Sequence, residues 1–182
     1  MTRQFHLLSL ILVLGLSFCS PRTKEKVIHP TWIKHNLPNS WIIYLPQPFK
    51  TSPLQGIDSQ PGYIASKVDS ILLNYDSGSE LIKQNIDDCK LSKQVSRAKS
   101  EIENDLEDYV GKESKIYNLT IEILDERVAI IRTPIIKGQH RVQLTIKDCK
   151  SGTWLNIYGE NFSEEREKLI VEIFKTVEFN DK

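Results

Sequence analysis

The sequence has no net charge, because its 24 Lys and Arg residues equal its 24 Asp and Glu residues. Charges of both signs are interspersed along the chain, without the basic stripe that nucleic-acid-binding proteins usually carry. We therefore expect no nucleic-acid partner. Apolar residues make up 40% of the chain and charged residues 26%, a balance that is typical of an ordered globular domain.

Sequence motifs of the common enzyme classes are also missing. The chain contains no G-x-S-x-G, H-E-x-x-H, G-x-G-x-x-G, Walker A or EF-hand pattern. It has no C-x-x-C pair, so the spacing that is typical of zinc and thioredoxin-like sites is absent. We expect no cofactor and no bound metal, and these absences favour a protein that is not an enzyme.

Long apolar runs are missing except near the N-terminus. Residues 7–16 are apolar apart from Ser9 and Gly15, Arg3 precedes them, and Pro21 follows. A transmembrane helix needs about 20 apolar residues, so this run is too short for a permanent span. It has the length and the flanks of a secretory signal peptide, which we place at residues 1–18.

The end of this segment, Leu16-Ser17-Phe18-Cys19, resembles the lipobox of bacterial lipoproteins. In such proteins the cysteine is diacylated and the chain is cut just before it, which predicts a membrane anchor at Cys19 and a location in the bacterial cell envelope. Phe18 stands where a small residue is usual. The alternative is therefore ordinary cleavage after Cys19, with Ser17 and Cys19 as the small residues of the cleavage site.

Residues 19–31 are polar and contain Pro21 and Pro30, so we interpret them as a lipidated tether. The remaining residues, 32–182, have the usual size of a single domain.

Two cysteines, Cys89 and Cys149, lie in the predicted domain. Export would place them in an oxidising compartment where a disulfide persists, and both have polar neighbours typical of the ends of structural elements. We predict that they pair and close a loop of about 60 residues, a bridge that would contribute about 4 kcal/mol. The alternative is two separate buried thiols.

The first half of the domain is rich in strand signals. Residues 41–45 are aromatic and β-branched and end at Pro46, which predicts a strand. A loop marked by Pro and Gly is expected next. Residues 63–65 and 71–75 then form a predicted hairpin that is closed by residues 67–70.

A helix and an antiparallel meander follow. The helix begins at Leu91, has Asp87 or Asp88 as its cap, and ends before Gly111. Its apolar stripe consists of Leu91, Val95, Ala98, Ile102, Leu106, Tyr109 and Val110. The predicted meander comprises residues 116–124, 128–131, 141–146 and 154–158, and a second helix (164–175, capped by Ser163) and a short strand (177–179) complete the domain. Strands and helices segregate, so we predict an α+β fold with helices packed against an antiparallel sheet.

This order of elements resembles that of the PsbP-like α/β/α sandwich proteins. The resemblance covers roughly residues 40–180 and is carried by the strand that ends in Leu45-Pro46 and by the closing segment 172–179. Residues 56–59 and 74–78 also look like segments of secreted lipoproteins of Bacteroidetes-type bacteria. The resemblance implies a domain used in assembly or binding, and it supplies no catalytic residues.

One polar cluster is a candidate ligand site. The chain enters and leaves the predicted hairpin at the same end, which brings Asp58 and Ser59 towards Tyr75 and Asp76. Two carboxylates with neighbouring hydroxyls suit a small ligand or a cation. The alternative is that these residues only form turns in which side-chain oxygens bind backbone amides.

These observations lead to two hypotheses about function. The first is a cell-envelope lipoprotein whose domain is non-catalytic and binds or assembles with an envelope protein. The second is an envelope hydrolase whose polar site includes Asp58 and Asp76.

Overall fold

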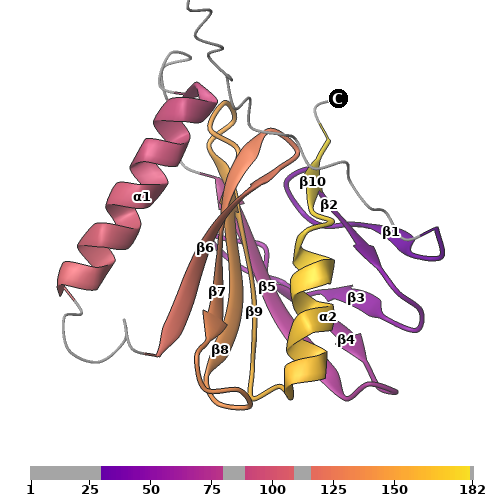
Figure 1. The fold of residues 1–182 in the computed structure, drawn as a ribbon. Helices are drawn as coiled ribbons and strands as arrows, with labels where there is room; N and C mark the ends of the chain where they lie inside the picture. The colour runs from indigo at the N-terminus through magenta and orange to yellow at the C-terminus, as the bar shows by residue number, and fades with distance from the viewer. Residues whose placement is uncertain (1–29, 80–88, 109–115, 181–182) are drawn as a thin grey trace, which may run out of the picture.

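The computed structural model describes residues 30–79, 89–108 and 116–180 (Figure 1). Its main element is an antiparallel seven-stranded sheet with the order β3-β4-β5-β9-β8-β7-β6. These strands are β3 (Lys50–Pro53), β4 (Gly62–Ser66), β5 (Ile71–Ser79), β6 (Tyr117–Leu124), β7 (Arg127–Pro134), β8 (Arg141–Lys147) and β9 (Thr153–Glu160). A second antiparallel sheet contains β1 (Ile33–Asn36), β2 (Trp41–Leu45) and β10 (Glu178–Phe179) in the order β1-β2-β10.

One face of the large sheet forms the core. Val142, Leu144 and Ile146 are buried, whereas Gln143 and Thr145 between them are half-buried, as the predicted alternation requires. The helix α2 (Glu164–Phe174) packs over this face with Ile170, Ile173 and Phe174, which are all fully buried. Trp41, Ile43 and Leu45 of the small sheet belong to the same core. The core face is therefore covered by α2 and by the small sheet.

The predicted Ser163 cap fixes where α2 begins. The Ser163 hydroxyl accepts a hydrogen bond from the backbone N–H of Arg166, at 3.5 Å. Glu164 and Glu165 then lie in the first turn, where the positive end of the helix dipole favours acidic side chains. The helix ends at Phe174, with Lys175 as its C-cap.

The helix α1 (Leu91–Asp108) lies on the opposite face of the sheet, over β6 and β7. Ala98 is buried and lines a small cavity together with Val128 and Ile130, which alternate along β7 with the core residues Ala129 and Ile131. Leu91 and Val95 of the predicted stripe are half-buried. Several predicted features of this helix lie outside the described residues. They are the side chains of Ile102 and Leu106, the residues Tyr109 and Val110, and the predicted caps Asp87, Asp88 and Gly111.

The α+β class, the antiparallel sheet and the packed helices are as the sequence predicted. The hairpin of β4 and β5 is confirmed with its loop, because Ser66 pairs with Ile71. Two strands, β1 and β3, were missed. Neither of the described helices is long and apolar enough to cross a bilayer.

Candidate functional site

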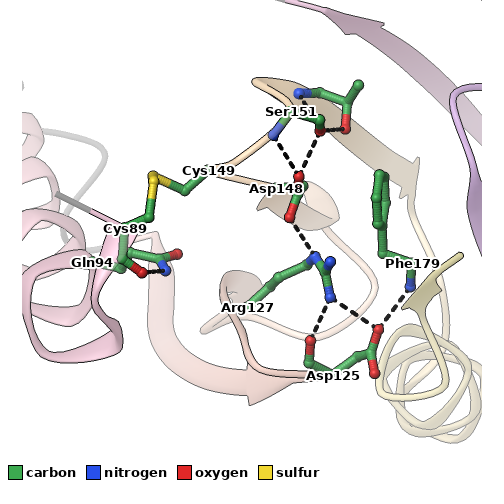
Figure 2. Close-up of polar contacts among 9 residues, drawn as sticks. Cys89, Gln94, Asp125, Arg127, Asp148, Cys149, Ser151 and Phe179 are labelled. Atoms are coloured by element: carbon green, nitrogen blue, oxygen red, sulfur yellow. Dashed lines mark hydrogen bonds and ion pairs between the residues drawn. A yellow bond between two sulfur atoms is a disulfide. The ribbon is translucent and has the colours of Figure 1, made fainter. Parts of the chain in front are cut away.

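A buried ion pair joins the turns at one end of the sheet (Figure 2). Arg127 and Asp148 are 6% and 4% exposed, and the Arg127 Nε donates to Asp148 Oδ1 at 2.8 Å. Arg127 Nη1 also donates to the Asp125 backbone oxygen at 2.7 Å and to its carboxylate at 3.1 Å. The guanidinium lies 4.5 Å from the centre of the Phe179 ring. One arginine thus connects the β6–β7 turn, the β8–β9 turn and β10.

The Asp148 carboxylate is held in its charged form. Burial alone would raise its pKa, but the backbone N–H and hydroxyl of Ser151 donate to Oδ2 at 2.7 and 2.5 Å, and Arg127 adds its positive charge. These contacts outweigh burial, so the pKa of Asp148 lies below its ordinary value of 3.8. Because every part of this network binds another part of the chain, we interpret it as a structural clamp.

The predicted disulfide is present beside this clamp. Cys89 and Cys149 are 60 residues apart in sequence, and their Cα atoms are 5.5 Å apart. Cys149 directly follows Asp148, and Cys89 lies two residues before α1, whose Gln94 side chain donates to the Cys89 carbonyl at 2.7 Å. The bridge therefore attaches the start of α1 to the β8–β9 turn.

The four residues of the predicted ligand site differ in their exposure to solvent. Asp58 is exposed in the loop between β3 and β4, where the next residue, Ser59, is half-buried. This loop does return to β5, because the Gln60 N–H donates to the Ser77 carbonyl at 2.7 Å. The proximity of the two backbone segments is therefore as expected, and the cooperation of Asp58 with Asp76 stays a prediction.

Tyr75 and Asp76 point to opposite faces of the sheet. Tyr75 is only 2% exposed and belongs to the core, where its ring lies so close to Gly62 that an added Cβ would be 2.2 Å from the Tyr75 hydroxyl. Burial raises the pKa of this hydroxyl, so it stays protonated at neutral pH. Asp76, the next residue, faces away from the core, so a site built on Asp76 does not include Tyr75.

Asp76 belongs instead to a polar row that crosses three adjacent strands. Asp76 of β5 pairs in register with Asn156 of β9, which pairs with Thr145 of β8. Thr145 Oγ1 donates to Asn156 Oδ1 at 2.7 Å, and the Gln143 amide donates to Thr145 Oγ1 at 3.2 Å. The Oδ1 atom of Asp76 is buried and has no hydrogen-bond partner among the described residues. We call Asp76, Asn156, Thr145 and Gln143 the polar row.

Two aromatic residues flank the polar row along β9. Trp154 and Tyr158 are the second neighbours of Asn156 and share its face of the sheet. Trp154 lies against Gly78, where an added Cβ would be 2.6 Å from the indole. Leu72 and Asn74, also on this face, are exposed, and Leu72 keeps 54% of its surface in solvent. On the same face α1 covers β6 and β7, and Thr145 lines the cavity that Ala98 of α1 also lines. We call the part of this face around Leu72, Asn74 and Asp76 the open face, because Leu72 and Asn74 are exposed among the described residues.

Sequence reasoning identified Asp76 but missed the rest of the polar row. The other residues of the row are about 70–80 positions away from Asp76 in the chain, and only the strand order brings them to it. These residues are Asn156, Thr145 and Gln143. A signal was present, because Gln143 and Thr145 alternate with buried apolar residues and thus mark the non-core face of β8.

No group of three or more His, Cys, Asp or Glu side chains within the described ranges is arranged to hold a metal ion. Cys19, the predicted lipidation site, lies outside them. Comparison of the chain with protein-family models and with curated proteins finds no significant match.

Proposed function

We propose that the chain is an exported lipoprotein of the bacterial cell envelope, anchored through Cys19, whose folded part is a non-catalytic binding domain related to the PsbP-like proteins. The disulfide between Cys89 and Cys149 supports export, because disulfides persist mainly in oxidising compartments. The open face supports a binding role, and the argument rests on Asp76.

The unpartnered oxygen of Asp76 is the observation that carries the binding role. A buried polar atom without a hydrogen bond costs about 1–3 kcal/mol, so such atoms are rare and need an explanation. Asp76 lies within a strand and its Oδ1 atom has no backbone amide as partner among the described residues, so a turn does not account for it. A partner protein that brings a hydrogen-bond donor to the Asp76 carboxylate accounts for the unpartnered oxygen.

The surroundings of Asp76 suit an envelope protein as that partner. Trp154 and Tyr158 are half-buried aromatic residues on either side of the polar row, and the Arg141 guanidinium lies 4.4 Å from the centre of the Tyr158 ring. Aromatic residues and arginine are enriched in protein interfaces. Leu72 adds exposed apolar surface on the same face. The row itself offers a carboxylate, an amide and a hydroxyl within three neighbouring strands.

Site-specific photocrosslinking in intact cells tests this role. A photoreactive amino acid at Leu72, on the open face, is expected to give a discrete adduct with an envelope protein, and Asp76→Ala in the same chain is expected to abolish it. The matched control carries the probe at Val68, which is 79% exposed but lies in the β4–β5 loop. The proposal is wrong if Leu72 gives no adduct, or if the adduct survives Asp76→Ala.

A further inference from the structure

The first half of α1 is held against the sheet by few apolar side chains. The structure describes the α1 side chains of residues 91–100, and of these Ala98 alone is buried, while Leu91 and Val95 are half-buried. The shorter helix α2, in contrast, has three apolar side chains that are 0% exposed. Because burial of apolar surface is the main stabilising term in packing, the described part of α1 gains much less from it than α2 does.

The packing between α1 and the sheet is also incomplete. A cavity of about 100 Å³ lies between them, and its lining includes Gln94 of α1, Val128 of β7 and Thr145 of β8. Atoms that face a cavity lack the van der Waals contacts that a close-packed interface provides. Lys93 and Arg97 of α1 also interact with other groups, but both are exposed, and the ion pairs of exposed side chains stabilise little.

The disulfide joins α1 covalently to the sheet. Cys89 lies two residues before α1, and Cys149 lies in the β8–β9 turn. The sheet side of the bridge is firmly held, because Cys149 directly follows Asp148, whose carboxylate binds Arg127 and Ser151 (Figure 2). Breaking the bridge therefore leaves the turn in place and weakens the attachment of α1.

A pocket gives access to the disulfide in the folded chain. It has a volume of about 320 Å³, and both cysteines line it together with residues that include Leu91, Ile123 and Lys150. Cys89 is half-buried, whereas Cys149 is only 5% exposed. Thiol–disulfide exchange requires that a thiolate reach one of the two sulfurs, and the more exposed residue, Cys89, is the one that it meets.

We propose that the bridge between Cys89 and Cys149 is a redox latch, which a dithiol reductant opens in the folded protein and which then releases α1 from the sheet. A thiolate of the reductant attacks the Cys89 sulfur, and the Cys149 sulfur leaves with the electron pair and takes up a proton. The second thiol of the reductant then attacks the reductant's own sulfur in the mixed disulfide and frees Cys89 as a thiol. Two electrons and two protons pass to the protein, and the reductant becomes a disulfide.

Release of α1 uncovers the part of the sheet that lies beneath it. Val128 and Ile130 of β7 and Thr145 of β8 line the cavity under the helix. This surface is continuous with the open face, because Thr145 belongs to the polar row. Reduction thus enlarges the surface that the sheet presents to the proposed partner, and this consequence rests on the proposed binding role. The opening of the latch does not rest on it.

Reduction followed by limited proteolysis of the purified full chain tests the latch without any partner. The chain is incubated with dithiothreitol in the absence of denaturant, its free thiols are alkylated and counted by mass spectrometry, and it is then digested with trypsin. Cleavage in α1, at Lys93, Arg97 or Lys99, reports release, because an isolated helix of 18 residues is marginal in water. Cleavage in α2, at Arg166 or Lys168, is the matched control.

We expect the bridge to be reduced without denaturant, and both helices to resist trypsin until it is. In the reduced chain α1 should be cleaved at least about tenfold faster than α2, because local opening precedes global unfolding. The double variant Cys89→Ser, Cys149→Ser should show the same difference without reductant. The proposal is overturned if reduction requires denaturant, if α1 still resists trypsin after reduction, or if both helices are cleaved at the same rate.

Discussion

Arg127 is a charged side chain that the fold almost completely removes from water. Its charge is balanced by Asp148. The Nε and Nη1 atoms of Arg127 and both carboxylate oxygens of Asp148 form hydrogen bonds within the clamp. Removing one partner of such a pair destabilises the fold by much more than the intact pair stabilises it, because the other charge is left buried and unpaired.

We therefore expect Asp148→Ala to lower the free energy of unfolding by about 3–5 kcal/mol. Glu172→Gln is the matched control, because Glu172 pairs with Lys175 at 3.1 Å but is 53% exposed. Urea denaturation measures both variants. Equal midpoints for the two variants would show that Arg127 and Asp148 do not form a stabilising clamp.

The clamp also predicts an acid-sensitive stability. The pKa of Asp148 is lowered in the folded chain, so its contribution is present above its ordinary pKa of 3.8 and is lost as the pH falls through the lower, folded value. The melting temperature of the wild type should therefore drop more steeply below about pH 4 than that of Asp148→Asn. If the melting temperatures of the wild type and of Asp148→Asn fell equally over this acid range, Asp148 would not be the group that makes stability acid-sensitive.

Replacing Asp76 should not lower the free energy of unfolding as replacing Asp148 does. Its Oδ1 atom is buried without a partner, so Asp76→Ala is expected to leave the free energy of unfolding unchanged or to raise it by about 1 kcal/mol. Urea denaturation decides this. A loss of stability comparable to that of Asp148→Ala would assign Asp76 a structural role and remove the main support for the open face as a binding site.

At the scale of elements, the disulfide determines how α1 is attached. The helix covers β6 and β7 on the face opposite α2, and Cys89 binds the start of α1 to the β8–β9 turn. In the double variant Cys89→Ser, Cys149→Ser, we expect a loss of up to about 4 kcal/mol, because a long loop is no longer closed in the unfolded chain.

Hydrogen exchange localises this effect. The backbone amides of α1 should exchange faster in the double variant, whereas those of α2, whose Ile170, Ile173 and Phe174 are fully buried, should keep more of their protection. Uniform acceleration across both helices would mean that the bridge stabilises the whole fold and has no special effect on α1.

The elements that the sequence predicted share a periodic apolar pattern. The strand β8 was predictable because its core face carries the alternating apolar residues Val142, Leu144 and Ile146. The start of α2 was predictable from its cap, Ser163. The strands β1 and β3 have the sequences IKHN and KTSP, and both are edge strands. They bury no alternating apolar residues, so their strand structure depends on pairing with β2 and β4, which no local pattern reveals.

At the scale of the whole molecule, sites are assembled by strand order. The polar row needs β5, β9 and β8 to be adjacent, and the clamp needs the β6–β7 and β8–β9 turns at one end of the sheet. The sequence could predict that β5 and β4 form a hairpin, which is a local contact. It could not predict that β9 would insert between β5 and β8, because that arrangement depends on the packing of the complete core.

The proposal as a whole depends on export and on the anchor at Cys19. Labelling of cells with a radioactive fatty acid, followed by isolation of the chain, tests it most directly. We expect label in the wild type and in the Cys89→Ser, Cys149→Ser variant, and none in Cys19→Ala, because of the three cysteines only Cys19 ends a segment that resembles a lipobox. Label that persists in Cys19→Ala, or a wild type without label, would contradict the lipoprotein assignment.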